Sequence, residues 1–123
     1  MLNTPFEQIG QETLYEMIDI FYRYVAHDTR INHLFPGDFE ETSRKQKQFL
    51  TQFLGGPTLY SDEHGHPMLR GRHMPFTIGS QEKDAWLENM YRAAHEVDMD
   101  KDVRTYLLQR LTLTAEHMVN AEY

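Results

Sequence analysis

One histidine lies in a segment of the sequence that suits it to bind a metal centre. His73 stands near the end of the stretch from 66 to 76, and a proline near each end of that stretch limits it to about two turns of helix. Arg70 and Arg72 flank the histidine, and methionine, leucine and phenylalanine supply apolar surface around it. A single imidazole held between apolar groups can serve as the axial ligand of a flat porphyrin whose acidic groups pair with the arginines. The competing interpretation is a surface histidine or a hydrogen-bonded core histidine.

A zinc site is a second metal interpretation of the same region. His64 and His66 form a His-x-His pair just before the stretch that contains His73. Protein zinc sites usually take three or four ligands from histidine, cysteine and carboxylate side chains. The sequence has no cysteine, and no further ligands follow at metal-binding spacing. We therefore favour one imidazole ligand to a macrocycle over zinc.

Two polar residues extend an apolar stripe on one predicted helix. Phe49 and Phe53 are spaced by four residues, and the same spacing leads back to Gln46 and Thr42. The stripe either reaches solvent at these two positions or faces a cavity. In the second case the cavity has an apolar floor and needs one or two hydrogen-bonding groups to orient a ligand.

A tyrosine and a tryptophan also lie on inner helix faces. Tyr22 is on the apolar stripe of the helix predicted from about Gln11 to Ala26, whereas Tyr24 is off it. Trp86 is the only tryptophan and lies on the inner face of a later helix. A buried tyrosine hydroxyl or indole N–H needs a partner. For Tyr22, a structural hydrogen bond in the core and a functional role both remain open.

Composition narrows the class of protein. The chain has 123 residues, which predicts one domain over 1–123, and a formal net charge of −7, which argues against nucleic acid or an anionic membrane as the main partner. The first residues lack the features of a signal peptide, and no apolar run approaches the length of a membrane span. The absence of cysteine excludes disulfides and is compatible with a cytoplasmic location.

The elements that must position these residues are all predicted to be helices. Thr4-Pro5-Phe6-Glu7 begins a short helix that Gly10 weakens, because threonine is a good N-cap and proline suits the first turn. No segment alternates with the period of a β-strand. We expect an all-α fold of two antiparallel helix pairs packed across each other. Further helices are predicted over 11–26, from about 38 to 55, from an N-cap at Ser80 to about 97, and from an N-cap at Asp100 to about 120, with a loop over 57–66 in which Tyr60 is anchored.

Taken together, these segments resemble a group II truncated haemoglobin, and the match is closest to members from Gram-positive bacteria. The resemblance extends over nearly the whole chain, in order and at matching spacing. It is carried by Phe21-Tyr22, Leu34-Phe35-Pro36, the run 44–50, Gly55-Gly56-Pro57, Tyr60, 64–67, 69–73 with Pro75-Phe76, Asp84-Ala85-Trp86 and His117-Met118-Val119-Asn120.

The resemblance implies a globin-like two-over-two helical sandwich, the truncated globin fold, that binds one haem b per chain. It implies that His73 is the proximal iron ligand. It also implies a distal ligand-binding group formed by Tyr22, Gln46, Trp86 and Thr42, and contacts to the haem from Phe35, Thr42, Lys45, Phe49, Tyr60, Leu69 and Arg72. Phe35 takes a position that is tyrosine in some group II relatives, so one hydroxyl donor is absent here.

The function implied is tight binding of dioxygen and other small diatomic ligands. Such binding suits oxygen, nitric oxide or peroxide chemistry, or scavenging, better than bulk transport. Weak peroxidase or nitric oxide dioxygenase activity is compatible with it and would require an external electron donor. Two alternatives remain open from the sequence: a haem-dependent gas or redox sensor, and a haem-free acidic helical module that binds a basic partner.

Overall fold

The computed structural model describes residues 3–35, 37, 39–68 and 78–120, and every regular element in these ranges is a helix. None of the helices in the described ranges is long and apolar enough to cross a membrane. The elements are α1 (Pro5–Ile9), α2 (Gln11–Ala26), the 3-10 helix η1 (Asn32–Leu34), α3 (Phe39–Phe53), α4 (Leu59–His64), α6 (Ser80–Glu96) and α7 (Lys101–Met118).

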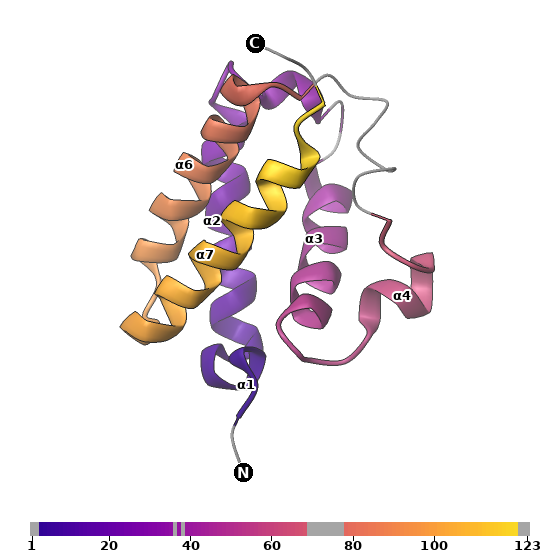
Figure 1. The fold of residues 1–123 in the computed structure, drawn as a ribbon, viewed down its shortest axis with the longest axis vertical. Helices are drawn as coiled ribbons and strands as arrows, with labels where there is room; N and C mark the ends of the chain where they lie inside the picture. The colour runs from indigo at the N-terminus through magenta and orange to yellow at the C-terminus, as the bar shows by residue number, and fades with distance from the viewer. Residues whose placement is uncertain (1–2, 36, 38, 69–77, 121–123) are drawn as a thin grey trace.

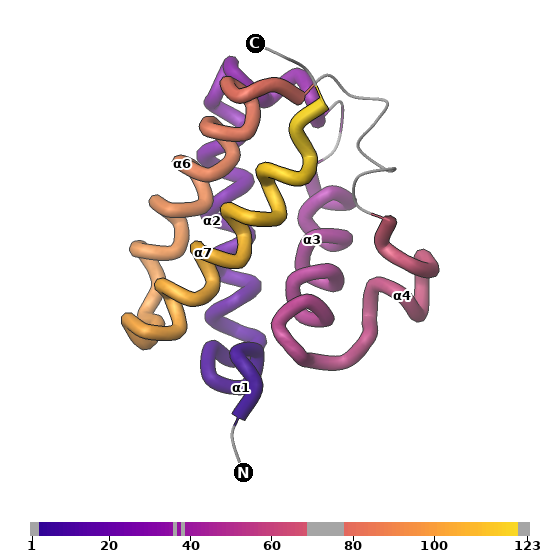
Figure 2. Tube along the Cα trace, in the orientation of Figure 1, coloured from indigo at the N-terminus to yellow at the C-terminus, as the bar shows by residue number. Residues whose placement is uncertain are grey.

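The long helices form two antiparallel pairs that cross each other. α2 packs against both α3 and α6, and α6 packs against α7. Figure 1 shows α7 crossing in front of α2, with α3 descending beside it. The tube in Figure 2 makes the same arrangement easier to follow and shows α4 beside α3, in agreement with the packing of these two helices. The all-α prediction of crossed pairs is therefore confirmed.

The centre of the core is the apolar stripe of α2. Leu14, Met17, Ile18, Phe21 and Val25 are all fully buried. Their spacing of three, one, three and four residues places them on one side of a helix, as the sequence predicted. The bounds of α2 coincide with the predicted range of 11–26.

The short N-terminal helix is set by local signals and by a close contact with α3. The Thr4 hydroxyl accepts the Glu7 backbone N–H at 3.1 Å, and α1 ends before Gly10, which has φ of +87°. The Phe6 N–H donates to the Leu54 carbonyl at 2.9 Å. Gly56 permits this contact, because a Cβ atom at that position would lie 2.7 Å from the Phe6 ring.

The prediction of a loop over 57–66 is wrong, because α4 occupies its centre. Six residues are too few to show helical periodicity, and such a short helix is unstable alone. Contacts with α3 hold it. Gln52 and Ser61 exchange two hydrogen bonds, from Gln52 Nε2 to Ser61 Oγ at 2.8 Å and from the Ser61 N–H to Gln52 Oε1 at 2.9 Å. Tyr60 is buried, as the prediction of an anchored aromatic requires.

The predicted N-cap of α6 is displaced by one residue. Gly79 is the N-cap and Ser80 is the first helical residue. Glu82 Oε1 accepts the Gly79 N–H at 2.8 Å, so the carboxylate caps the helix from within its own first turn. The N-cap of α7 is Asp100, as predicted: its carboxylate accepts the N–H groups of residues 102 and 103. α7 ends two residues before the expected position.

Candidate functional site

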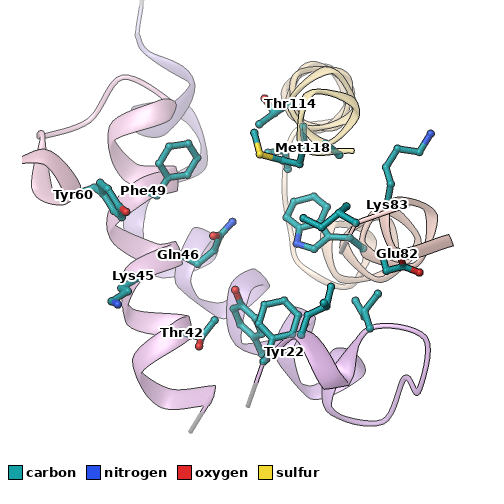
Figure 3. A pocket seen from close by; sticks show the side chains of 17 residues that line it. Tyr22, Thr42, Lys45, Gln46, Phe49, Tyr60, Glu82, Lys83, Thr114 and Met118 are labelled. Atoms are coloured by element: carbon teal, nitrogen blue, oxygen red, sulfur yellow. The ribbon is translucent and has the colours of Figure 1, made fainter. Parts of the chain in front are cut away.

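A cavity of about 570 Å³ lies between the two helix pairs, and its volume is within the range of about 300–1,000 Å³ typical of small-molecule sites. Figure 3 shows the cavity with side chains of α3 on one side and side chains of α6 and α7 on the other. The structure brings together eight of the residues singled out from the sequence. They are Tyr22, Phe35, Thr42, Lys45, Gln46, Phe49, Tyr60 and Trp86.

Tyr22 reaches the cavity from the central stripe of α2. Its ring packs edge-on against Phe21 and Phe35, with centroids 4.8 and 5.9 Å apart, and only 6% of the residue is exposed. Figure 3 shows the hydroxyl pointing into the cavity, toward Gln46. Burial raises the pKa of Tyr22. The side chain therefore stays protonated at neutral pH and presents an O–H donor.

α3 supplies the opposite wall. Thr42, Gln46 and Phe49 lie at helical spacing on its inner face, and Figure 3 shows Gln46 extending into the cavity. The stripe therefore borders a cavity at the two polar positions, which answers the question that the sequence left open. Contacts with Asp19 on α2 hold the helix in this orientation: Ser43 Oγ donates to the carboxylate at 3.3 Å, and Lys47 Nζ lies 2.8 Å from it.

Trp86 comes from α6 and packs edge-on against Phe21 at a centroid distance of 5.1 Å. One turn further along the helix, Asn89 Nδ2 donates to Asp28 Oδ2 at 2.9 Å. Asp28 follows the end of α2, so this bond ties the helix of Trp86 to the helix of Tyr22. The two side chains line the same cavity from different helices.

The polar tips in the cavity have no partners within the part of the chain that the structure describes. Neither the Tyr22 hydroxyl, nor the Gln46 amide, nor the Trp86 indole N–H makes a hydrogen bond there. Tyr22 is 6% exposed, whereas Gln46 and Trp86 are half-buried, and all three residues line the cavity. Among the described residues, the fully buried side-chain atom without a hydrogen-bond partner is Thr51 Oγ1, so the cavity donors are open to the cavity rather than enclosed by protein. A ligand with an acceptor atom in the cavity would satisfy these donors.

The sequence reasoning missed much of the remaining wall. The α7 residues Leu111, Ala115 and Met118 also line the cavity, and periodicity cannot distinguish a cavity wall from a packed core. Glu82 lines the cavity as well, and its bond to Gly79 shows that it caps α6. The other lining residues that were missed are Ile31, Leu34, Ile78, Lys83 and Thr114.

Three residues singled out from the sequence, Leu69, Arg72 and His73, lie outside the described residues. Of the His-x-His pair, His64 Nε2 lies 2.8 Å from Gln48 Oε1 and 3.1 Å from Glu63. Among the described residues, no three histidine, aspartate or glutamate side chains gather in a way that could hold a metal ion.

The cavity residues fit a haem. Most of the lining side chains are aliphatic or aromatic and suit the faces of a macrocycle, and Tyr22, Gln46 and Trp86 add neutral hydrogen-bond donors. The other polar lining residues are Thr42, Lys45, Tyr60, Glu82, Lys83 and Thr114. Lys45 places a cation at the exposed edge of α3, where an acidic substituent could pair with it. The fold and the cavity together define a small helical protein of the globin class.

Comparison with known proteins gives the family. A model of the bacterial-like globin family matches residues 4–120, and the chain belongs to this family. It is 53% identical over 118 residues to a group 2 truncated hemoglobin of Bacillus subtilis, a match that covers 96% of this chain and 89% of the relative. A two-on-two hemoglobin of Arabidopsis thaliana is 34% identical, over 93% of this chain and 67% of the relative.

Comparison with solved structures gives the same family. The group II truncated hemoglobin of Bacillus anthracis superimposes with a TM-score of 0.97 at 48% identity, over 100% of this chain and 95% of the other. A structure described as a truncated oxygen-avid haemoglobin from Bacillus subtilis gives a TM-score of 0.93 at 53% identity, over 96% and 100% of the two chains. The resemblance inferred from the sequence is confirmed, and so is the truncated globin fold. Globins bind haem and small diatomic ligands.

Proposed function

We propose that this chain binds one haem b and holds dioxygen tightly, for oxygen, nitric oxide or peroxide chemistry or for scavenging rather than for bulk transport. One observation carries the proposal. Tyr22, Gln46 and Trp86 line one apolar cavity, and their donor groups have no partner among the described residues. The similarity to a protein described as oxygen-avid supports the same function.

The chain's own residues would hold the cofactor in three ways. Phe35, Phe49 and the aliphatic side chains of the cavity exclude water from its faces, and Lys45 is a cation for an acidic group at its edge. On the sequence evidence alone, His73 would be the iron ligand, and Leu69 and Arg72 would contact the haem. When bound, the haem supplies an iron atom at which dioxygen and other diatomic ligands bind.

The distal residues would act as hydrogen-bond donors toward a ligand that carries partial negative charge. Tyr22 keeps its proton because burial raises its pKa, and indole and amide N–H groups do not ionise at neutral pH. A charge-assisted hydrogen bond contributes about 1.5–3 kcal/mol. Two such bonds would slow ligand release by roughly two to four orders of magnitude, at about 1.4 kcal/mol per factor of ten.

Phe35 modifies this donor set. Its ring packs against that of Tyr22 and lines the cavity, but it has no hydroxyl group. In this chain it therefore limits the orientations of Tyr22 and excludes water without donating a hydrogen bond. Thr42, on the neighbouring wall, also lines the cavity.

The same donors would polarise a bound peroxide, so weak peroxidase activity is part of the proposal, as is conversion of nitric oxide to nitrate. Both reactions would require electrons from a partner that reduces the haem. The proposed location is the cytoplasm, where such a reducing partner would be available.

Haem titration tests the proposal. The sequence has a single tryptophan, and that residue lines the cavity. We expect hemin to produce an intense Soret absorption band and to quench Trp86 fluorescence, with both signals reaching an end point at one hemin per chain. A His73→Ala variant should lose the spectrum of an imidazole-ligated ferrous haem, and added imidazole should restore it. If added hemin produces neither of these two signals, the proposal is refuted and the haem-free module is favoured.

A further inference from the structure

The half-buried carboxylate of Asp28, just after α2, connects three segments of the chain. Asp28 Oδ1 accepts the Arg30 backbone N–H and Nε–H, each at 3.0 Å, and Oδ2 accepts Arg30 Nη2 at 2.8 Å and Asn89 Nδ2 at 2.9 Å. Arg30 Nη1 continues to Glu88 Oε2 at 2.8 Å. Asn89 is 3% exposed, and the Asp28 side chain is 12% exposed. We refer to Asp28, Arg30, Glu88 and Asn89 as the Asp28 cluster.

The Asp28 cluster bonds to the backbone that carries Trp86. Asn89 Nδ2 also lies 2.9 Å from the Ala85 carbonyl, which belongs to the peptide group that links Ala85 to Trp86. The Asn89 amide therefore fixes this turn of α6 to the carboxylate of Asp28. Because Asp28 follows directly on α2, the same contact sets the distance between this turn and α2.

The third segment is the turn that leads to η1. The N–H groups of Ile31 and Asn32 both donate to the Asp28 carbonyl, at 3.2 and 2.9 Å. This turn delivers Ile31 and Phe35 to the cavity wall. One aspartate thus joins the segments that carry three walls of the cavity. α3 is held separately, through Asp19.

An aromatic contact lies between the Asp28 cluster and the cavity. The Trp86 ring rests edge-on against Phe21 on α2, at a centroid distance of 5.1 Å. A rotation or shift of this turn of α6 would move the indole across the Phe21 ring and change the direction of its N–H. Hydrogen bonds lose strength steeply when their geometry departs from linearity, so a small shift would weaken a bond to a ligand.

We propose that the Asp28 cluster is a positioning device that aims the Trp86 indole N–H at the bound ligand, with Asn89 as its principal positioning residue. Asn89 does not line the cavity and acts through Trp86. The inference rests on the proposed function, because its test measures the rate of oxygen release. It adds to that function a group outside the cavity that controls how long the ligand stays bound.

The test compares Asn89→Ala with a matched control, Arg104→Ala. Arg104 also fastens α6, by donating to the Ala94 and Val97 carbonyls at 2.8 and 3.1 Å, but it does so at the end of the helix remote from Trp86. We expect both variants to lower the melting temperature of the haem-loaded protein. Only Asn89→Ala should speed oxygen release, by about fivefold or more, while Arg104→Ala stays within about twofold of the parent chain.

A double-mutant cycle identifies the residue through which Asn89 acts. If Asn89 aims the indole, its replacement should have little effect on oxygen release in a Trp86→Phe background. The proposal is overturned if Asn89→Ala releases oxygen within about twofold of the parent, if Arg104→Ala has an equal effect, or if the effect persists in full without Trp86. Should Asn89→Ala fail to fold, Arg30→Lys tests the same cluster by the same criteria, because lysine keeps the charge and loses the forked donor geometry. A parent chain that shows no Soret band with hemin refutes the proposed function instead.

Discussion

Trp86 in the cavity and Asn89 in the Asp28 cluster lie about one turn apart on α6, but the polar groups of the two regions differ in their hydrogen bonding. In the cluster, both carboxylate oxygens of Asp28 accept two hydrogen bonds each, and Arg30 and Asn89 each bond to two different residues. In the cavity, the donors of Tyr22 and Trp86 meet no acceptor among the described residues. The cluster's groups bond to one another within the protein, whereas the cavity's donors remain available to a ligand.

This contrast separates residues that bond within the protein, and act on a ligand only through Trp86, from residues that would contact a ligand directly. Removing the Asp28 carboxylate leaves the buried amide of Asn89 without one of its two acceptors, which costs stability, whereas Arg30 and Glu88 are partly exposed and can bond to water. Removing a donor from the cavity leaves no protein group unpaired, so stability should change little and ligand binding should change greatly. The following predictions test this separation, in order of decreasing expected effect.

Tyr22→Phe should have the largest effect. Loss of one charge-assisted hydrogen bond should make oxygen release roughly ten- to a hundredfold faster, measured by stopped-flow mixing of the oxygenated protein with a competing ligand. The melting temperature should change little, because the Tyr22 hydroxyl has no hydrogen-bond partner among the described residues to lose. Tyr15→Phe is the control, since Tyr15 is a half-buried tyrosine of the same helix that does not line the cavity. Equal release rates in the two variants would contradict the distal role.

Asp28→Ala should mainly lower the stability of the fold. The variant leaves Arg30 and Asn89 without their carboxylate, and we expect the free energy of unfolding to fall by about 2 kcal/mol. Denaturant unfolding of the haem-loaded protein measures this change. A fall no larger than that of Tyr22→Phe would remove the distinction between the two regions.

The stability of the folded chain should depend on pH through the ionisation of Asp28. The Arg30 guanidinium, followed by the Asn89 amide, holds the pKa of Asp28 well below its ordinary value, against the opposing effect of burial. Because the pKa of Asp28 is lower in the folded chain than in the unfolded chain, its contribution to stability is complete above the unfolded pKa of about 3.9. The contribution is lost as the pH falls through the pKa of the folded chain. Unfolding measured below about pH 4 should therefore be less dependent on pH in Asp28→Asn than in the parent. Parallel curves would refute this assignment.

Arg44→Gln should have the smallest effect. Arg44 bridges Glu41 and Glu63 at 2.7 Å each, and so links α3 to α4, but all three side chains are about half exposed. Exposed ion pairs contribute little and are screened by salt. We expect a melting temperature only slightly below that of the parent, a difference that disappears in high salt, and an unchanged rate of oxygen release. A faster release would mean that α4 contributes to the distal site.

The sequence by itself determined most of the helical framework. The stripe of α2 and the caps at Thr4 and Asp100 depend on residues within a few positions of one another, so periodicity and capping chemistry locate them. Local pattern also identified Gln46 and Trp86 as polar-tipped residues on inner faces. It could not show whether those faces border a packed core, solvent or a cavity.

Only the tertiary structure decided the rest. α4 forms because Gln52 and Arg44 reach residues 9 and 19 positions away, contacts that no local pattern contains. The Glu82 carboxylate that caps α6 at Gly79 is only three residues away in the sequence, but its burial depends on how the helices pack. The bonding of Asp28 to Asn89 spans 61 positions, and whether a buried polar group is paired depends on such contacts. The sequence therefore showed which residue types are present. Only the packing of distant segments decided which polar side chains bond within the protein and which remain available to a ligand.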